Sequence, residues 1–286
     1  MTAGDPRLAA VLAGAFYKLS GSGNDFVFFD ARGHGEPPEV PPEVTRALCA
    51  RGTGVGADGL VMLDQPGPGR VRIAYYNSDG SRATLCGNAT LCTASLARHL
   101  DAVAPGEAFV IETDAGPLRA VVAESGPPSF ELAPVADLEL DARTAWGGEL
   151  GTATARRVGY AVAGVPHLVL VVDDVESVPL ADDGPRLRRA GRGRPDGANV
   201  NWVSSLAGGR WRLRTFERGV EAETLACGTG AVAAAALLHA WGLAGLDVEL
   251  MTSSTLPLRV TLHPAGLRGP QLAGEGRLVF TGQLPR

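Results

Sequence analysis

The 286-residue sequence contains a single lysine, Lys18, and its net charge is -5. Because there is no basic excess, binding to nucleic acid or to an anionic membrane surface is not indicated. No apolar run reaches the roughly 20 residues that a membrane-spanning helix needs. The four cysteines form no Cys-x-x-Cys pair and have no histidine at zinc spacing, which argues against a metal site and a disulfide framework. We expect a cytoplasmic protein with reduced thiols and a small-molecule partner.

The length of the chain exceeds the usual size of one domain, and its apolar residues, 45% of the total, are distributed throughout. We therefore expect two domains. The Gly126-Pro127-Pro128 break is the candidate boundary. It predicts an N-terminal domain over residues 1–127, joined by a C-terminal strand over 276–286, and a second domain over residues 128–275.

Two stretches repeat one pattern, in which a strand, a polar loop and a cysteine precede a helical run. Cys86 follows the loop Asn77-Ser78-Asp79-Gly80, and Cys227 follows Glu217-Arg218-Gly219. The two cysteines are 141 residues apart (227 minus 86). At a helix N-terminus, free N–H groups and the helix dipole favour a thiolate.

The patterns of apolar residues place these motifs within alternating strands and helices. We predict helices over residues 42–51, 85–100 and 231–240. We predict strands over residues 16–19, 26–29, 60–63, 71–76, 108–113, 118–123, 129–133, 155–162, 168–172, 199–203, 211–216 and 277–284. Gly164-Val165-Pro166-His167 is predicted to be a turn, and Cys92 a buried core thiol.

Two such units facing each other would place one sulfur on each side of a shared cleft. This arrangement suits inversion of a carbon centre, because one thiolate removes a proton and the opposite thiol returns one to the other face. At an amino-acid α carbon, the developing charge needs donors, which the backbone N–H groups of Gly87, Asn88, Gly228 and Thr229 would supply. Pyridoxal phosphate chemistry would need a Schiff-base lysine, and Lys18 lies inside the first predicted strand.

The order of the motifs resembles that of the diaminopimelate epimerase family over nearly the whole chain. The matching segments are Gly23-Asn24-Asp25-Phe26, Gly56-Ala57-Asp58-Gly59, Asn77-Ser78-Asp79-Gly80, Cys86-Gly87-Asn88, Pro166-His167, Asn199-Val200-Asn201, Glu217-Arg218-Gly219 and Ala226-Cys227-Gly228-Thr229-Gly230. Each segment alone is weak evidence, but together they are specific.

The resemblance implies an α+β fold of two pseudo-symmetric domains, each a β-sheet wrapped around a central helix. It implies Cys86 and Cys227 as the base and acid pair, with His167 and Glu217 beside the thiols. Further residues around the substrate would be Asn24, Asn77, Asn199, Glu217 and Arg218, together with Gly87, Asn88, Gly228 and Thr229. It implies no cofactor, a small amino-acid substrate in lysine biosynthesis, and a homodimer.

For several of these residues, a purely structural role is also open. Asn77 and Asn199 are also typical of turns and caps. His167 could be a structural histidine, and Arg218 could form a surface ion pair.

Two departures from the family pattern concern the substrate. Val165 stands where the family usually has an asparagine that contacts the distal end of diaminopimelate, and a valine cannot donate to a carboxylate. The segment Cys86-Gly87-Asn88-Ala89-Thr90-Leu91-Cys92 alters the first helical turns but keeps the thiol.

The hypothesis is therefore a diaminopimelate epimerase. The alternatives are a racemase of another amino acid, such as histidine, and a non-inverting isomerase or binding protein of the same fold. A thiol redox protein is disfavoured because each cysteine has its own helix.

Overall fold

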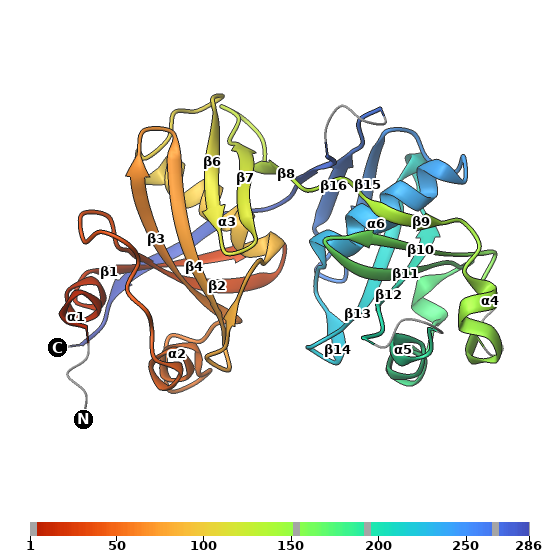
Figure 1. Cartoon of the computed structure of the whole chain (residues 1–286), viewed down its shortest axis with the longest axis horizontal. Coiled ribbons are helices and arrows are strands. Elements are labelled where there is room, and N and C mark those ends of the chain that lie inside the picture. Colours follow the sequence, from red (N-terminus) through yellow and green to blue (C-terminus); the bar gives the residue numbers. More distant parts are fainter. Residues whose placement is uncertain (1–4, 151–154, 192–195, 265–268, 286) are drawn as a thin grey trace. The chain divides into compact units, whose positions relative to one another are not determined.

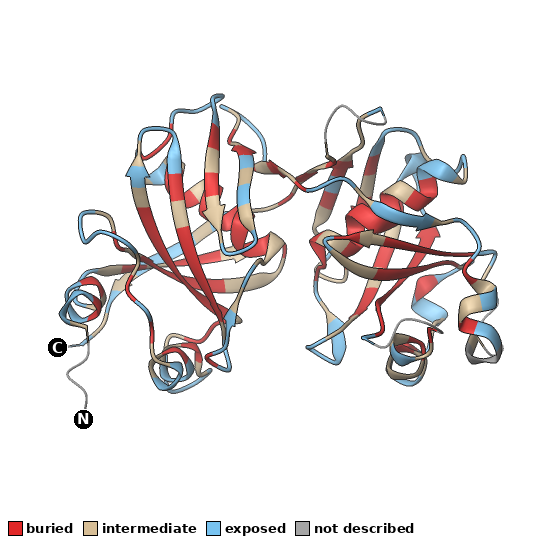
Figure 2. Cartoon of the chain, viewed as in Figure 1, coloured by how far each residue is buried: buried red, intermediate tan, exposed pale blue. Residues whose placement is uncertain are grey.

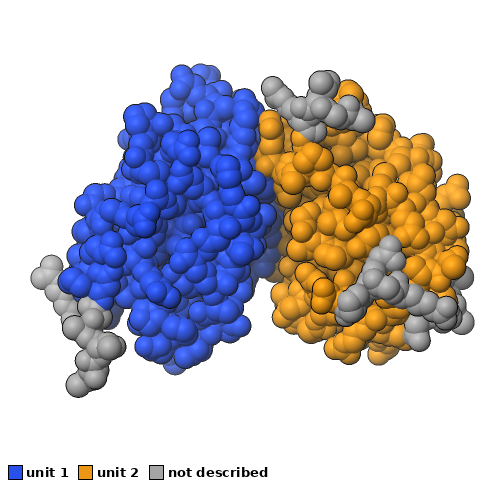
Figure 3. All heavy atoms as spheres, in the orientation of Figure 1, with its two compact units in different colours: residues 1–130, 274–286 blue, residues 131–273 orange. Residues whose placement is uncertain are grey.

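The computed structural model describes residues 5–150, 155–191, 196–264 and 269–285. The chain forms two compact units, which Figure 3 shows in blue and orange. Unit 1 comprises residues 1–130 and 274–286, and unit 2 comprises residues 131–273. The domain limits expected from the sequence stay a prediction, because a compact unit need not fold independently.

Unit 1 begins with a short helix and contains most of its sheet before residue 130 (Figure 1). Its elements are α1 (Pro6–Leu12), β1 (Ala15–Gly21), β2 (Asn24–Asp30), α2 (Pro42–Cys49), β3 (Gly59–Gly67), β4 (Arg70–Asn77), β5 (Arg82–Ala83), α3 (Gly87–His99), β6 (Ala108–Thr113), β7 (Gly116–Val121), β8 (Ser129–Glu131) and β18 (Arg277–Gln283). Strand β1 pairs with β18 and β2, and β2 pairs in parallel with β3. Strand β4 pairs with β3, β5 and, in parallel, β6, and β7 pairs with β6 and β8.

Unit 2 repeats this order. Its elements are β9 (Ala136–Glu139), α4 (Arg143–Trp146), β10 (Arg157–Ala163), β11 (Val165–Val171), α5 (Leu180–Arg189), β12 (Asn199–Ser205), β13 (Trp211–Glu217), β14 (Ala222–Thr224), α6 (Gly228–Ala240), β15 (Asp247–Met251), β16 (Pro257–Thr261) and β17 (Gln271–Ala273), with 3-10 turns over residues 147–150, 175–177 and 207–209. Strand β10 pairs with β9 and β11, and β11 pairs in parallel with β12. Strand β13 pairs with β12, β14 and, in parallel, β15, and β16 pairs with β15 and β17.

Each sheet surrounds one long helix. In unit 1, α3 packs against β1, β2, β4, β6 and β18, and in unit 2, α6 packs against β10, β11, β12 and β16. The alanine-rich α6 is buried over most of its surface (Figure 2), as expected for a helix that is apolar all round. The predicted α+β class, with two similar halves that each wrap a helix, is confirmed.

The β1–β2 hairpin positions Asn24 at the first residue of β2, next to the turn. Gly21 pairs with Asn24, so the turn consists of Ser22 and Gly23, with φ angles of 52° and 98°. A two-residue turn with both central φ angles positive matches the right-handed twist of the flanking strands. The two strands therefore extend closer to the turn than the predicted ranges 16–19 and 26–29.

Two elements differ from the prediction. Residues 6–12 form a helix, α1, which is absent from the helices predicted from the sequence. Asp5 caps this helix by accepting from the backbone N–H of Arg7 at 2.9 Å, and Pro6 occupies its first turn.

The turn predicted over residues 164–167 is confirmed only at Gly164, which joins β10 to β11 with a φ of 75°; the prediction is wrong for residues 165–167, because β11 already begins at Val165. Its pairing with β12 starts at His167, so the missing N–H of Pro166 removes no bond on that side.

No helix in the described ranges is long and apolar enough to cross a membrane. Likewise, no group of three or more His, Cys, Asp or Glu side chains in the part of the chain that the structure describes is arranged to hold a metal ion.

Candidate active site

Cys86 and Cys227 occupy the same local position in their units. Each is the N-cap residue of a 13-residue helix, α3 or α6, with extended backbone angles of φ -136° and ψ 116° for Cys86 and φ -123° and ψ 107° for Cys227. Neither helix has an acidic residue in its first turn. The positive end of each helix dipole therefore acts on the thiol without a neighbouring carboxylate in that turn, which favours the thiolate form.

In unit 1, two asparagines lie side by side at the N-terminus of α3. The Asn88 amide donates to Asn24 Oδ1 at 2.9 Å, and Asn24 Nδ2 donates to Asp58 Oδ2 at 2.9 Å. Asp58 also accepts from the backbone N–H of Asp25 at 3.2 Å. Two of the four asparagines predicted at the site, Asn24 and Asn88, are thus held in one chain of hydrogen bonds that leads to Asp58.

An ion cluster adjoins this chain of hydrogen bonds at Asp58 and contains the single lysine, Lys18. Lys18 is 7% exposed, pairs with Asp25 at 2.7 Å and donates to the carbonyl oxygen of Gly56. Arg51 bridges Asp25 at 2.6 Å and Asp58 at 2.7 Å. The pKa of Asp25 is lowered by Arg51 and Lys18 even though burial acts in the opposite direction. Lys18 therefore stabilises the strands on either side of the Gly23-Asn24 turn. Its amine is engaged in these contacts and is not positioned to form a Schiff base.

In unit 2, Asn201 lies close to the N-terminus of α6, which Cys227 caps, and His167 contacts Asn201. Asn201 Nδ2 lies 3.1 Å from His167 Nδ1 and 3.0 Å from the carbonyl oxygen of Leu168, and Thr215 donates to Asn201 Oδ1 at 2.9 Å. A Cβ atom at Gly230 would lie 2.3 Å from Asn201 Oδ1 and 3.2 Å from Cys227 Sγ. Only glycine fits there, so Gly230 lets the helix N-terminus and its cysteine approach Asn201 closely.

The hydrogen bonds of Asn201 settle the form of His167. Because the Leu168 carbonyl can only accept, the Asn201 amide nitrogen must face it, and the same nitrogen then donates to His167 Nδ1. Nδ1 is unprotonated, so the proton resides on Nε2, which is buried and has no hydrogen-bond partner in the described residues. Burial, and secondarily the charge of Arg218, lowers the pKa of His167 to about 3. The imidazole is therefore neutral near pH 7.

Glu217, Arg218 and Asn199 meet where β13 ends. Asn199 Oδ1 accepts from the backbone N–H of Arg218 at 2.6 Å, which leaves the Asn199 amide N–H groups as donors. Burial raises the pKa of the Glu217 carboxyl above its ordinary value. No carboxylate in the described residues forms an ion pair with the half-buried Arg218 guanidinium. Arg218 is consequently available to an anionic ligand.

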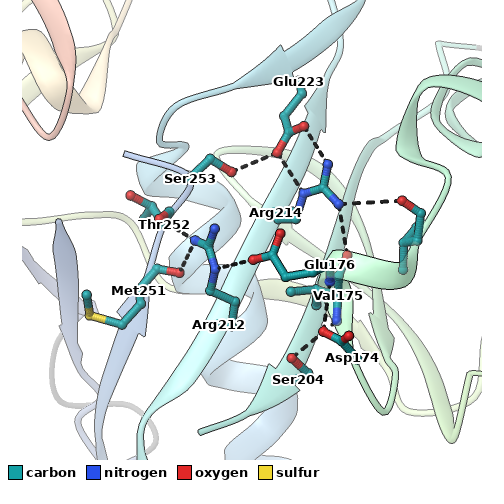
Figure 4. A network of polar contacts seen from close by, with 11 residues as sticks. Asp174, Val175, Glu176, Ser204, Arg212, Arg214, Glu223, Met251, Thr252 and Ser253 are labelled. Carbon is teal, nitrogen blue, oxygen red and sulfur yellow. Dashed lines mark hydrogen bonds and ion pairs between the residues drawn. The ribbon is translucent and has the colours of Figure 1, made fainter. Parts of the chain in front are cut away.

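The loop that leads to Cys227 is tied to the sheet by Arg214 (Figure 4). Arg214 makes two hydrogen bonds to Glu223, at 2.8 and 2.7 Å, and donates to the carbonyl oxygen of Val175 at 2.9 Å. Ser253 donates to the same Glu223 at 2.8 Å, and the backbone N–H of Ser254 donates to Leu225 O at 3.0 Å. These contacts fix both sides of the segment between β14 and α6.

The predicted site residues divide between the two units. Cys86, Asn24, Asn77, Gly87 and Asn88 lie in unit 1, whereas Cys227, His167, Asn199, Glu217, Arg218, Gly228 and Thr229 lie in unit 2. Asn77 bonds to its own turn, because its Nδ2 donates to Ser81 Oγ at 3.0 Å. Thr229 Oγ1 lies 3.6 Å from Cys227 Sγ.

Sequence reasoning missed two residues that contact the predicted ones, namely Asp58, which accepts from Asn24, and Asn201, which lies 3.1 Å from His167 Nδ1. Asn201 follows Asn199 by two positions and so lies on the same face of β12, which the strand period could have shown.

Comparison with known proteins identifies similar sequences over most of the chain. The family model described as diaminopimelate epimerase matches residues 16–135 and 159–254. The chain is 46% identical to a diaminopimelate epimerase of Gemmatimonas aurantiaca, over 94% of this chain and 99% of that protein. It is 37% identical to a diaminopimelate epimerase of Methanothrix thermoacetophila, over 89% of this chain and 92% of that protein.

A solved structure shares the fold. The PhzF-family phenazine biosynthesis protein of Bacillus anthracis matches with a TM-score of 0.69 over 95% of this chain and 99% of its own. The two sequences are 15% identical, so this likeness concerns the fold alone.

Proposed function

The chain belongs to the diaminopimelate epimerase family, and we propose that it interconverts LL- and meso-diaminopimelate by a cofactor-independent, two-base mechanism in lysine biosynthesis. The observation that carries the proposal is the repeated thiol. Cys86 and Cys227 cap equivalent helices in two units of the same strand order. A redox or packing role for one cysteine would give no reason for this duplication.

In the proposed reaction, one sulfur is a thiolate and the other a thiol. The thiolate takes the α proton, the C–H bond breaks, and its electron pair spreads into the substrate carboxylate. The opposite thiol then gives its proton to the other face of the carbon, so the two sulfurs exchange protonation states in each turnover. Backbone N–H groups at Gly87, Asn88, Gly228 and Thr229 would hold the charged carboxylate at the two helix N-termini.

Glu217 and His167 would assist in different ways. The raised pKa of Glu217 keeps part of this carboxyl protonated closer to neutrality, so it can exchange a proton with a neighbouring group. His167 is neutral and presents a buried Nε2–H group, which suits a hydrogen bond to an anion and not removal of a proton.

The rest of the substrate would be held by Asn24, Asn77 and Asn199 together with Arg218. A guanidinium without an ion-pair partner in the described residues suits the distal carboxylate of diaminopimelate. Val165 is half-buried at the first position of β11 and can offer only an apolar contact. Arg218 and Asn199 would therefore supply the polar recognition of that end.

The test is hydrogen exchange in deuterated water, followed by NMR and mass spectrometry with the thiols reduced. LL- and meso-diaminopimelate should each acquire one deuterium at the inverted α carbon. A panel of other L-amino acids, histidine included, should acquire none. Exchange into one of those amino acids and not into diaminopimelate would replace the proposed substrate, and exchange into no amino acid would refute epimerisation.

A homodimer and a cytoplasmic location form part of the same proposal. All four cysteines are free thiols, which a reducing compartment preserves. Sedimentation equilibrium of the reduced protein should give about twice the 29.5 kDa of one chain. A single species at the monomer mass under assay conditions would contradict the dimer.

A further inference from the structure

Asn201 lies on β12, is fully buried, and holds three polar partners. Its Nδ2 lies 3.0 Å from the Leu168 carbonyl oxygen and 3.1 Å from His167 Nδ1, and its Oδ1 accepts from the Thr215 hydroxyl at 2.9 Å. We propose that Asn201 is a positioning residue that holds His167 as the Nε2-protonated tautomer, so that the buried Nε2–H group serves as a hydrogen-bond donor during the reaction. Asn201 acts through His167 and does not itself contact the reacting atoms.

The repeated fold shows that packing alone does not require this polar cluster. In the strand register of unit 1, the residues equivalent to His167, Asn201 and Thr215 are Phe26, Val61 and Tyr75. Phe26 and Val61 are buried, as His167 and Asn201 are, but they are hydrocarbon side chains. The same arrangement of strands is therefore stable with no amide and no imidazole at these places.

The free ring nitrogen of His167 gives the polar cluster of unit 2 a purpose. His167 is 0% exposed, and its Nε2 is buried with no hydrogen-bond partner in the described residues. Leaving a buried N–H group unpaired is destabilising, and native proteins rarely do so. A residue kept for packing could be a phenylalanine, as in unit 1. An unpaired donor is what a site needs if its acceptor arrives with the substrate.

The orientation of the Asn201 amide is fixed on every side that the structure describes. Because the Leu168 carbonyl can only accept, a flipped amide would set Oδ1 against another acceptor. The Thr215 hydroxyl donates to Oδ1 in the orientation observed. A Cβ atom at Gly230 would lie 2.3 Å from Oδ1, so helix α6 also packs closely against the amide. A single orientation keeps an N–H donor facing His167 Nδ1.

The charge around His167 leaves the tautomer as the remaining variable. Burial, and secondarily the charge of Arg218, lowers the pKa of the imidazole to about 3, so the ring carries one proton near pH 7. Asn201 donates to Nδ1, so that proton lies on Nε2. The catalytic consequence, donation from Nε2–H to an anionic group of the substrate, rests on the proposed function. The tautomer itself does not.

The test is ¹⁵N NMR of the full-length, reduced protein labelled at histidine, without substrate and at pH 8. Two-bond correlations between ring protons and ring nitrogens identify the tautomer, and the signals of His167 are those lost in His167→Phe. The wild type should show a protonated Nε2 and an unprotonated, hydrogen-bonded Nδ1. A protonated Nδ1, or a mixture of both tautomers, would overturn the proposal without the need for any Asn201 variant.

Asn201→Asp reverses the donor at nearly constant shape. A carboxylate, ionised at pH 8, has no proton to give to Nδ1, so Nδ1 should become the protonated nitrogen and donate to the aspartate. With diaminopimelate as substrate, kcat should fall by about 10- to 100-fold, as expected when a hydrogen bond to a charged group is lost. If the variant keeps the wild-type tautomer, Asn201 does not determine it.

Thr215→Val is the matched control. It removes a hydroxyl from the same buried cluster but leaves both Nδ2 contacts of Asn201 in place. The tautomer of His167 should be unchanged, and kcat should stay close to the wild-type value. Equal losses of kcat in Thr215→Val and Asn201→Asp at matched Tm would reduce Asn201 to a structural residue and contradict the proposal.

The two readouts separate this inference from the proposed function. If the protein does not turn over diaminopimelate, the NMR spectra of the wild type and of Asn201→Asp still decide whether Asn201 sets the tautomer. If turnover is observed and the wild-type tautomer is the opposite one, the inference fails while the proposed function stands.

Discussion

An exposed ion pair holds the segment before Cys86 in place, whereas a more buried ion pair holds the segment before Cys227. In unit 1, Arg82 on β5 pairs with Asp114 at 2.5 and 2.8 Å, and its side chain is 46% exposed. In unit 2, the arginine is Arg214 on β13, 16% exposed, and the acid, Glu223, lies on β14. The short strand before the cysteine thus carries the arginine in unit 1, where the acid comes from the β6–β7 turn, and the acid in unit 2, where the arginine comes from the neighbouring strand. The repeat therefore preserves the position of the cysteine and not the chemistry around it.

The same contrast holds at the sulfurs. The N-terminus of α3, which Cys86 caps, has the hydrogen-bonded pair Asn88 and Asn24, whereas Cys227 has Thr229 at 3.6 Å, with Asn201 and a neutral histidine near the N-terminus of α6. In the register of the two sheets, His167 corresponds to Phe26, since each pairs with the start of its parallel neighbour, β12 or β3. Two similar halves have thus acquired different means of controlling one thiol each.

Removing either thiol should have the largest effect. Cys86→Ala and Cys227→Ala should each lower inversion by about 10³-fold or more, because each removes one of the two proton carriers. The measurement is α-deuterium incorporation by NMR. Cys49→Ala is the control and should retain activity, because Cys49 is a buried core thiol of unit 1. Inversion by either single-cysteine variant would rule out the two-base scheme and show that the two units contribute unequally to catalysis.

Arg218→Met should lower kcat/KM for diaminopimelate by about 10- to 100-fold, since it removes charge-assisted hydrogen bonds to the distal carboxylate. Steady-state kinetics measure the effect. Arg210→Met, at an exposed arginine that contacts the carbonyl oxygen of Ala207, should behave like the wild type. Equal kinetics for both variants would assign Arg218 to the protein surface.

Replacing His167 by phenylalanine, the residue at the equivalent place in unit 1, should change how stability depends on pH. Burial lowers the folded-state pKa of His167 to about 3, well below the ordinary histidine value of about 6.5, so the unfolded state binds the proton first as pH falls. The wild type should therefore lose about 2 kcal/mol of unfolding free energy between pH 7 and pH 5 through this group. Urea unfolding should show a smaller loss in His167→Phe, although the variant is less stable at pH 7. Parallel pH profiles would show that His167 is not held neutral.

The smallest expected effects are on stability, and they should distinguish the segment before Cys227 from the segment before Cys86. Glu223→Gln should destabilise the protein by about 1–2 kcal/mol, because it weakens hydrogen bonds to the partly buried Arg214. Asp114→Asn should cost under about 1 kcal/mol, because its pair with Arg82 is more exposed. The free energies of unfolding of the two variants are compared by urea unfolding at pH 7.

The pH dependence gives an independent check on Glu223. Arg214 lowers the pKa of Glu223 in the folded protein, so the contribution of this carboxylate is present above its unfolded pKa and is lost as pH falls through the folded one. The difference between wild type and Glu223→Gln should accordingly shrink on acidification below about pH 4.5. If Asp114→Asn proves the more damaging variant at pH 7, the contrast in burial does not determine how these loops are held.

Much of the fold could be predicted from periodicity, and the family predicted from the motifs is confirmed by the comparisons. The long helices behind the cysteines were predicted to within a few residues of α3 and α6, because their apolar runs are uninterrupted. The turn predicted at His167 failed because proline is usually a breaker, and only the pairing of β11 with β12 shows that Pro166 is tolerated. Helix α1 was missed although Asp5 and Pro6 are an N-terminal signal.

The sequence by itself determined that two cysteines begin two equivalent helices, because helix propensity, glycine placement and polar loops are local properties. The tertiary structure decided what surrounds each sulfur. The hydrogen bond from Asn88 to Asn24, the tautomer of His167 and the ion pair of Lys18 depend on strand register and burial, which join residues that are far apart in the chain. Spacing can place a thiol at a helix N-terminus, but only the packed neighbours set its charge.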